Sequence, residues 1–555
     1  MNAHLHQLVG DCDSSSSASV SLSRVPSVKE IRYDRQLRLW GDHGQERLEK
    51  SHVCLLNATA AGTELLKSLV LPGVGRFTIV DAASVTDDDV SCNFFVSHDS
   101  VGQPRAEIAC KLLKELNPDV NGDAVVESAE ALLQNDVSFL NRFSLVIGCN
   151  LTDRLACSLG EYLWSRDVPL VLCRCVGLVG CLRVCVREHC VVESHPDHEF
   201  DDLRLDQPFP ELVTLVNAID LDALSHEDHS HLPYVVLLLK ALQQWRTDNN
   251  LQLNAFPQNH RHKMEIKQIL LNLRKPDDKG RLDEDNFAEA VTNLNRALRV
   301  TQVPSNVQQL FSDAKTAHLS GDWSEFSLIV TAIKQFTEET GSLPLRGALP
   351  DMTAHSWRYI QLQHAYQQRA VQDAKRVHSL VQTLQRGDAQ ASKVTFERVH
   401  LYCKHAHQLH CVRGTSITDE LRQPNIDAIN ELLQEKNDAF SWYIQLRARE
   451  RFRAEKNRYP GTNGVPVKLD TLDLSQRVSC LLKHWALDDR RRANVNHDQT
   501  GELCRYGNSE LHPVAAVLGG VGAQECIKLL TAQYVPLNNT YMYDANSATG
   551  SVFHL

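Results

Sequence analysis

The sequence has no apolar run that approaches the roughly 20 residues needed by a helix that spans a bilayer. Its first 28 residues also lack the basic start and the apolar middle of a secretory signal. Basic residues are also outnumbered: the sequence has 58 lysines and arginines and 69 aspartates and glutamates, which gives a formal net charge of -11. We therefore expect an intracellular protein, cytoplasmic or nuclear, whose main partner is neither a membrane nor a nucleic acid.

The sixteen cysteines include no CxxC pair of the kind that holds zinc in small zinc domains. The densest group, at 173–190, lies in strand-like sequence, where Cys173 and Cys175 share one face of a strand. Such spacing is typical of small buried hydrophobic side chains, so we predict free thiols and no metal. Two histidine groups, at 226–231 and 405–410, also lack paired ligand spacing and are interpreted as surface histidines.

Glycine is missing where a nucleotide-binding turn needs it. An expected strand at Val53–Leu56 is followed by a turn at Asn57–Gly62 and a helix at Thr63–Leu71, the order in which a Rossmann-type domain places phosphates at a helix N-terminus. Glycines in such a turn let the backbone approach phosphate oxygens, but Gly62 is the only one here. The residues that fill the other positions include Asn57, Thr59, Ala60 and Ala61. The sequence therefore predicts the scaffold of a nucleotide site without an intact cofactor-binding loop.

Strands and helices alternate after this turn. A second strand, Phe77–Asp81, ends in an acid at the spacing of a carboxylate that binds ribose. Further helices are expected at Pro104–Leu116 and Asp153–Trp164, with strands near Val125, at 145–147 and at 170–173. This order requires a mainly parallel, doubly wound sheet. Because strand-like sequence returns after about residue 502, we expect the C-terminus to rejoin that sheet.

Helical spacing of apolar residues dominates from about residue 205 to 485. Between Tyr359 and Leu384, apolar residues recur at a mean interval of about 3.6, which is the α-helical repeat. The predicted fold is therefore an α/β, doubly wound, Rossmann-like adenylation-type domain interrupted by a large all-helical insertion. We assign residues 1–27 to a disordered tail, 28–195 and 495–555 to the two parts of the α/β domain, and 196–494 to the insertion.

Two further segments carry candidate binding residues. After Ile31, Asp34 can pair with Arg38, whereas Arg35 has no carboxylate at its helical neighbour positions and is free to bind another group. A solvated surface arginine is the alternative. The loop at 341–351, which its prolines and glycines keep from being helical, suits either an ordinary connection or a partner surface. The residues predicted for that surface are Leu343, Pro344, Leu345, Arg346 and Gly347.

Long, ordered motifs produce a resemblance that spans residues 31–555. They include YDRQLRLWGDHGQ, LLNATAAGTELLKSLVLPGVGRFTIVD, RAEIACKLLKELNPDV, ESHPD, LRLDQPFPEL, LPLRGALPDM and the closing CRYG and LGG segments. The chain resembles the regulatory, inactive adenylation subunits of the heterodimeric neddylation-activating enzymes, in the ubiquitin-activating enzyme family. The resemblance implies that this chain does not catalyse alone. It implies a catalytic partner subunit that binds ATP and magnesium, adenylates the C-terminal glycine of a ubiquitin-like modifier and carries the acceptor cysteine, with a conjugating enzyme joining the complex.

The same resemblance assigns roles to individual residues. Active halves of the family hold phosphates with an Asn-Arg-Gln motif and a lysine, whereas the matching positions here are Asn93-Phe94-Phe95 and Arg105. The magnesium aspartate of active halves matches Thr152, or Asp153 after a shift of one residue. Arg35 matches an arginine that the inactive half extends across the dimer to an ATP phosphate. The helical insertion matches the catalytic-cysteine domain, without its cysteine.

Several alternatives stay open. The chain could instead be the corresponding half of the SUMO-activating enzyme, a self-sufficient adenylating enzyme or oxidoreductase that uses Asp81, or a pure scaffold. The insertion of roughly 280 residues argues against the SUMO enzyme, and the missing glycines argue against a self-sufficient enzyme. Cys403 and Cys411 are the best placed of the thiols for an acceptor role, but we expect the thioester cysteine to lie on the partner.

Overall fold

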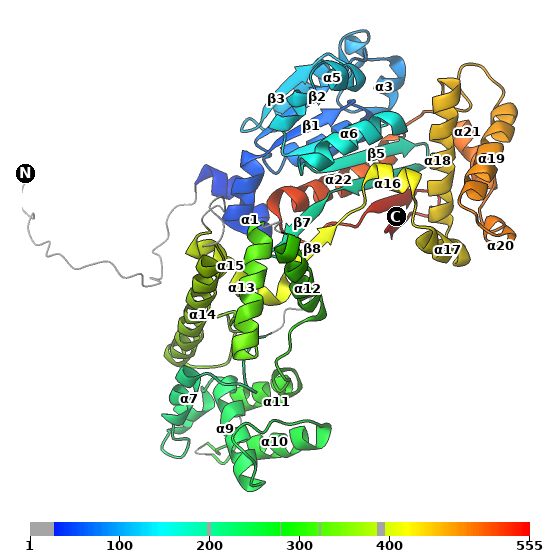
Figure 1. The fold of residues 1–555 in the computed structure, drawn as a ribbon. Helices are drawn as coiled ribbons and strands as arrows, with labels where there is room; N and C mark the ends of the chain where they lie inside the picture. Colours follow the sequence, from blue (N-terminus) through cyan, green and yellow to red (C-terminus); the bar gives the residue numbers. More distant parts are fainter. Residues whose placement is uncertain (1–26, 197–200, 278, 283, 321–323, 386–393) are drawn as a thin grey trace, which may run out of the picture.

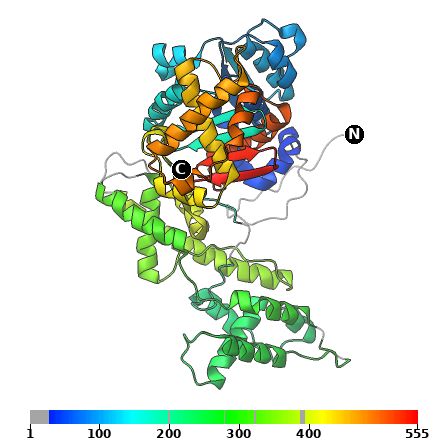
Figure 2. The same ribbon diagram turned by 90° about the vertical axis from the view of Figure 1, so that its right-hand side faces the viewer.

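The computed structural model describes residues 27–555 apart from 197–200, 278, 283, 321–323 and 386–393. The predicted disordered tail, residues 1–27, lies outside the described residues except for Ser27, which caps helix α1 (Val28–Lys50). A domain built on a β-sheet lies at the top of Figure 1, and two helical lobes extend below it. Figure 2 shows the same stacking after a quarter turn.

Within the described residues, the main sheet has eight strands in the order β10-β9-β6-β5-β4-β1-β2-β3. The parallel strands are β1 (His52–Leu56), β2 (Arg76–Val80), β3 (Asn121–Val125), β4 (Leu145–Cys149) and β5 (Leu170–Val176). The strands β6 (Val179–Cys185), β9 (Thr540–Asp544) and β10 (Thr549–Phe553) continue the sheet in antiparallel pairs. Because β9 pairs with β6, the prediction that the C-terminus rejoins the sheet is confirmed.

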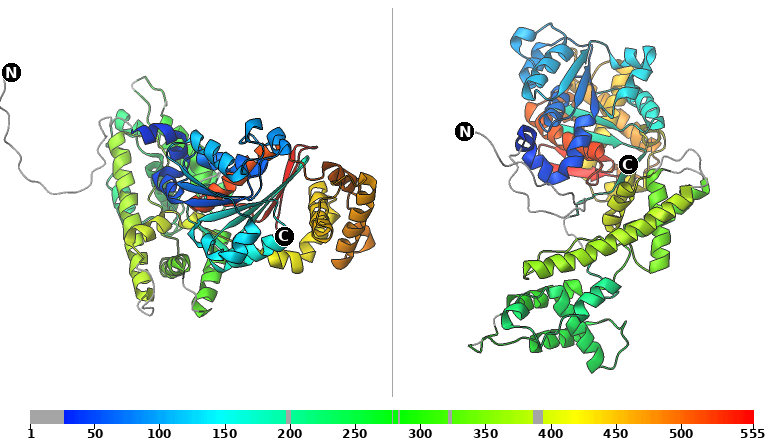
Figure 3. Two further views of the ribbon diagram at one scale, coloured as in Figure 1. Left: turned by 90° about the horizontal axis from the view of Figure 1, so that it is seen from above. Right: turned by 90° about the vertical axis from the view of Figure 1, so that its left-hand side faces the viewer.

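Helices cover both faces of this sheet (Figure 3, left), as the doubly wound prediction requires. Alternate residues of β1 enter opposite cores: Val53 and Leu55 face one, and Cys54 and Leu56 face the other. The first core includes residues of α2 (Ala60–Val70), α4 (Arg105–Leu116) and α22 (His512–Thr531). The second includes residues of α5 (Ala129–Asn135) and α6 (Asp153–Ser165). Short helices in the same domain are α3 (Asp87–Cys92), η1 (His98–Ser100) and η2 (Val137–Arg142).

Helix α22 corrects the expectation that no apolar run comes near membrane-spanning length. By length and composition it could cross a membrane, but most of its apolar window is buried inside the protein. It packs closely on α2, because Gly519 leaves room where a Cβ would lie 2.7 Å from the Cβ of Glu64. The helix is therefore apolar because it forms part of the core.

The helical insertion forms two lobes that share one long helix, α14 (Ser356–Gln385), which Figure 3 (right) shows crossing between them. The lower lobe contains α7 (Pro210–Asn217), α8 (His226–Ser230), α9 (Tyr234–Asp248), α10 (His260–Asn272) and α11 (Asp285–Ala297). The upper lobe contains α12 (Ser305–Ser320), α13 (Glu325–Thr340), α15 (Phe396–Lys404) and η3 (Ala406–Gln408). The predicted apolar stripe on α14 is confirmed as core, with Leu362 and Tyr366 in the lower lobe and Ala374 and Val377 in the upper.

The structure refines the predicted insertion in two ways. First, most of its last helices pack on the antiparallel strands of the sheet, since they share a core with Val179, Met542 and Phe553. These helices are α17 (Ile426–Gln434), α18 (Asp438–Lys456), α19 (Val467–His484) and α21 (Asp498–Tyr506), with the short helix α20 (Asp489–Arg492) beside α17. Helix α16 (Ile417–Arg422) instead enters the second core of the sheet domain and packs on α6. Second, the chain enters and leaves the lobes through an antiparallel ribbon of β7 (Glu188–Val191) and β8 (His410–Arg413). The boundaries at 196 and 494 stay predictions.

Candidate functional site

The degenerate turn lies between the end of β1 and the start of α2, where this fold places nucleotide phosphates. Asn57 occupies the left-handed region with φ 67°, a conformation that asparagine adopts more readily than most residues. Its backbone N–H donates to the carbonyl of Val80 at 3.0 Å, and its side-chain amide donates to the carbonyl of Cys149 at 2.9 Å. Asn57 thus makes the turn without glycine and ties together the ends of three adjacent strands.

The first turn of α2 is enclosed by the domain core. Thr59 is the N-cap residue, and its hydroxyl accepts from the N–H of Gly62 at 3.4 Å. A Cβ at Gly62 would lie only 2.9 Å from the sulfur of Cys149, so a larger residue does not fit there without a shift of its neighbours. Ala60 and Ala61 are 2% and 1% exposed and belong to the core of the sheet domain. Their methyl groups therefore pack into that core.

The N-terminus of α2 is occupied by a carboxylate that the sequence analysis missed. Glu510 lies just before α22, and its Oε2 accepts from the backbone N–H of Ala61 at 3.1 Å. Its Oε1 accepts from the side-chain amide of Asn150 at 2.7 Å. Burial raises the pKa of Glu510, and hydrogen bonds from Ala61, Asn150 and Thr59 offset part of that rise. The only signal in the sequence was an acid just before a helix of small residues.

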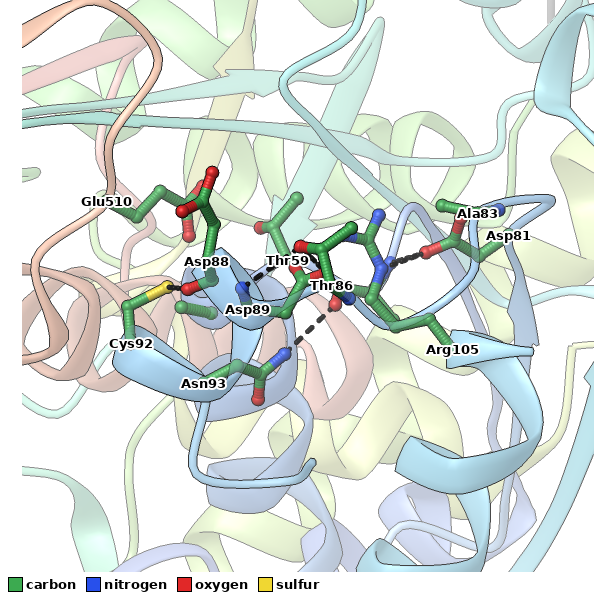
Figure 4. Close-up of polar contacts among 12 residues, drawn as sticks. Thr59, Asp81, Ala83, Thr86, Asp88, Asp89, Cys92, Asn93, Arg105 and Glu510 are labelled. Carbon is green, nitrogen blue, oxygen red and sulfur yellow. Dashed lines mark hydrogen bonds and ion pairs between the residues drawn. The ribbon is translucent and has the colours of Figure 1, made fainter. Parts of the chain in front are cut away.

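Asp81 is the acid at the spacing expected of a ribose ligand. Both of its carboxylate oxygens accept hydrogen bonds from other groups of this chain (Figure 4). It is 2% exposed, and its Oδ2 accepts from the N–H of Ala58 and from Nε of Arg105, both at 2.8 Å. Its Oδ1 accepts from the N–H of Ala83, also at 2.8 Å. Arg105 binds Asp89 as well, at 2.7 Å. Burial lowers the pKa of Arg105, but the two carboxylates outweigh burial and raise it.

The Asn93-Phe94-Phe95 segment offers no charge to a phosphate. Asn93 is buried, and its Oδ1 accepts from the hydroxyl of Thr63 at 2.9 Å while its amide donates to the carbonyl of Ala58 at 3.2 Å. Phe95 is buried in the core, whereas Phe94 is 70% exposed. These contacts make the segment a structural support for the turn.

The structure also places both candidates for a magnesium aspartate. Thr152 is the N-cap of α6, where its hydroxyl accepts from the N–H of Leu155 at 3.2 Å. Asp153 is bound by Arg174, whose Nη2 lies 2.6 Å from Oδ1. Burial raises the pKa of Asp153, but Arg174 and Arg447 outweigh burial and hold it below its ordinary value. A carboxylate neutralised in this way is a poor ligand for a cation.

Arg35 lies on the exposed side of α1, a helix that is kinked at Tyr33 and Gly41. Its neighbours are paired: Arg32 lies 3.4 Å from Asp119, and Arg38 lies 3.0 Å from Asp34. Arg35 makes no hydrogen bond or ion pair with any residue that the structure describes. The structure therefore agrees with the prediction that Arg35 has no local carboxylate, and its role toward ATP stays a prediction.

The predicted partner surface at 343–347 is wrong for its apolar members. Leu343 and Leu345 are each 1% exposed, and they enter the upper and the lower lobe core respectively. Pro344 between them is buried as well. The segment was interpreted as surface because most loops are exposed, but here it joins two cores. Arg346 and Gly347 are half-buried, and their role in partner binding stays a prediction.

The histidine groups differ from the prediction, whereas the described cysteines are free thiols as predicted. His229 is fully buried with its Nδ1 2.5 Å from Glu284, and His405 is 7% exposed, so neither is a surface histidine. Cys403 is buried in the upper lobe, and burial raises its pKa far above the usual range. This makes Cys403 a poor candidate for a thioester acceptor.

The ribbon between β7 and β8 brings together one set of possible metal-ligand atoms. The sulfurs of Cys190 and Cys411 lie 4.0 Å apart, and both approach the carboxylate of Glu188. The other oxygen of Glu188 is bound by Arg413 at 3.0 Å. Glu188, Cys190 and Cys411 lie far in the sequence from the degenerate turn at Asn57–Gly62, so they form a separate group.

Comparisons with known proteins agree with this geometry. The model of the ThiF family matches residues 33–555. The chain is 44% identical over 536 residues to the NEDD8-activating enzyme E1 regulatory subunit of Danio rerio, which covers 95% of this chain and 99% of that protein. It is 41% identical to the Xenopus laevis protein of the same name, covering 96% and 100%, and 36% identical to the Arabidopsis thaliana regulatory subunit AXR1, covering 93% and 94%. The resemblance read from the motifs is thereby confirmed: the chain belongs to the ThiF family and, within it, to the family of NEDD8-activating enzyme E1 regulatory subunits.

Proposed function

We propose that this chain is the non-catalytic half of a heterodimer whose catalytic subunit binds ATP and magnesium and adenylates a ubiquitin-like modifier. The names of the relatives, which describe regulatory subunits of an activating enzyme, support a heterodimer of this kind. The observation that carries the proposal is the state of the degenerate site. Three groups that would face a nucleotide or its metal, the Ala61 amide, Asp81 and Asp153, are all bound to side chains of this same chain.

The charges around the turn also support the proposal that ATP binds to the catalytic subunit and not to this chain. Asp81, Asp88, Asp89 and Glu510 are drawn together in Figure 4, where Arg105 is the only cation among the labelled residues. An excess of carboxylates repels a triphosphate and cannot stabilise the charge that develops during adenylation. The chain therefore lacks the means to hold ATP, while its sheet still provides a scaffold for a partner.

Arg35 is the residue we propose to act across the dimer. Its guanidinium is exposed and has no acid partner among the described residues, so no internal ion pair has to break before it can bind a phosphate. The modifier and a conjugating enzyme then bind the assembled pair, in an intracellular compartment. We further propose that the helical lobes are the counterpart of a catalytic-cysteine domain, with the acceptor thiol supplied by the partner.

The proposal is tested by measuring ATP-pyrophosphate exchange, with modifier present, for this chain, for a candidate catalytic subunit, and for the two mixed. We expect the two subunits to co-purify and exchange to require the pair. Exchange by this chain alone, or a reductant-sensitive modifier thioester on this chain, contradicts the proposal and favours the self-sufficient alternative.

A further inference from the structure

Two of the free backbone donors at the start of α2 are hydrogen-bonded to side chains. A helix begins with N–H groups that have no partner within the helix, and its positive end attracts an anion. In α2, the N–H of Gly62 is taken by the hydroxyl of Thr59, three residues away. The N–H of Ala61 is taken by Glu510, 449 residues away. The anion at this helix end is therefore supplied by a distant part of the same chain.

The position of this carboxylate within the sheet is specific. In the strand order, β1 has β4 on one side and β2 on the other, so the connections diverge between β1 and β4. Open α/β sheets bind their ligands at such a divergence, outside the carboxyl ends of the strands. Glu510 is held by Ala61, which follows β1, and by Asn150, which follows β4. It thus lies at the place where this fold binds a ligand.

The segment just before Glu510 is anchored by two other parts of the chain, the end of β5 and Arg449 of α18. Gly177, at the end of β5, donates its N–H to the carbonyl of Ser509 at 2.8 Å. Arg449, which is 1% exposed, donates to the carbonyl of Gly507 at 3.2 Å and to the side chain of Asn508 at 3.1 Å. The segment before α22 is therefore held in place independently of the contact with α2.

We infer that Glu510 is the resident anion of this chain: its carboxylate takes, in cis, the place that the fold gives to a nucleotide phosphate, and so keeps the site closed. The inference rests on the proposed function and deepens it, because it names the group that excludes nucleotide. The missing glycines remove features that would favour a phosphate, whereas Glu510 both fills the position and repels a second anion.

The test uses the full chain with Glu510→Ala, Glu510→Gln and, as a control, Glu502→Ala on the neighbouring helix α21. Hydrogen exchange of the peptide that contains Ala61 reports directly on the contact, and calorimetry measures the binding of inorganic pyrophosphate. We expect Glu510→Ala to exchange faster at this peptide and to bind pyrophosphate at least about tenfold more tightly than wild type, because one repelling charge is gone. The Glu502→Ala protein should match wild type in both measurements.

Glu510→Gln keeps the shape and removes the charge, so it tests the idea even if the alanine variant folds poorly. We expect it to bind pyrophosphate more tightly than wild type and less tightly than Glu510→Ala. Pyrophosphate binding equal to wild type in both variants, with unchanged exchange at Ala61, overturns the inference. That result is distinct from failure of the proposed function, which would appear as exchange activity in the wild-type chain alone.

Discussion

Replacing Arg105 with methionine should loosen the degenerate site. The change keeps the aliphatic stem and removes a guanidinium that lies 2.8 Å from Asp81 and 2.7 Å from Asp89. The side chains of Arg105, Asp81 and Asp89 are only 15%, 3% and 14% exposed, so water screens these ion pairs weakly. Breaking a buried ion pair typically costs about 3 to 5 kcal/mol. Because Asp81 keeps two backbone donors, we expect a smaller loss of about 2 to 3 kcal/mol.

The measurement is hydrogen exchange of peptides from the end of β2 through α3, since a chain with several cores does not unfold in one step. A loss of 2 to 3 kcal/mol corresponds to roughly 30- to 150-fold faster local opening. The matched control is Arg76→Met, which removes a 2.7 Å ion pair to Asp123 in the same sheet whose side chains are 54% and 46% exposed. An exposed pair of this kind contributes about 1 kcal/mol at most. Equal exchange in the two variants would refute the argument from burial.

Three further predictions follow from the same structure. Arg35→Ala should slow ATP-pyrophosphate exchange by the heterodimer roughly 30- to 1,000-fold, which corresponds to 2 to 4 kcal/mol, with dimerisation intact. Arg38→Ala should leave the exchange rate unchanged. A wild-type exchange rate in Arg35→Ala would contradict the proposal that Arg35 binds an ATP phosphate on the partner subunit. On α22, Gly519→Ala should lower the melting temperature by a few degrees, because its Cβ would lie 2.7 Å from Glu64, at a cost of about 1 to 3 kcal/mol. At Gly520 an added Cβ would meet nothing within 4 Å, so Gly520→Ala should raise the melting temperature through its higher helix propensity. A change of the melting temperature in the same direction in both variants would contradict the close packing of α22 on α2. Burial, with a smaller effect of Arg47, lowers the pKa of His189 from 6.5 to about 4, so between these pH values the unfolded chain binds a proton that the folded chain does not. The free energy of local opening around β7 should fall by up to roughly 3 kcal/mol as the pH drops through this window. His189→Gln should remove that part of the loss, as measured by hydrogen exchange of the peptide that contains β7 at both ends of the window.

The elements that the sequence predicted well are those whose signal is local. The strand and helix order from β1 to β6 and the stripe on α14 depend on repeats of 2.0 and 3.6 residues, which report burial directly. The lack of a carboxylate beside Arg35 could be predicted for the same reason, because its possible helical partners lie within four residues.

The interactions that could not be predicted join residues far apart in the chain. Nothing near Glu510 or Arg105 shows that each binds a group from another element, because such pairs exist only after folding. The failures at Leu343, Leu345 and His229 have a related cause. Each lies in a polar or proline-containing segment that is typical of surface loops, and tertiary packing buried it against residues of other helices.

The ribbon of β7 and β8 carries the chain both into and out of the two lobes. Val191 lies directly opposite His410, so the outgoing and returning chains are neighbours at the point of crossing. Antiparallel strands placed in this way can be joined by a hairpin of two to five residues. Excising the intervening residues and grafting such a hairpin in their place should leave a smaller protein that still carries the eight-stranded sheet, and with it the degenerate turn and Arg35.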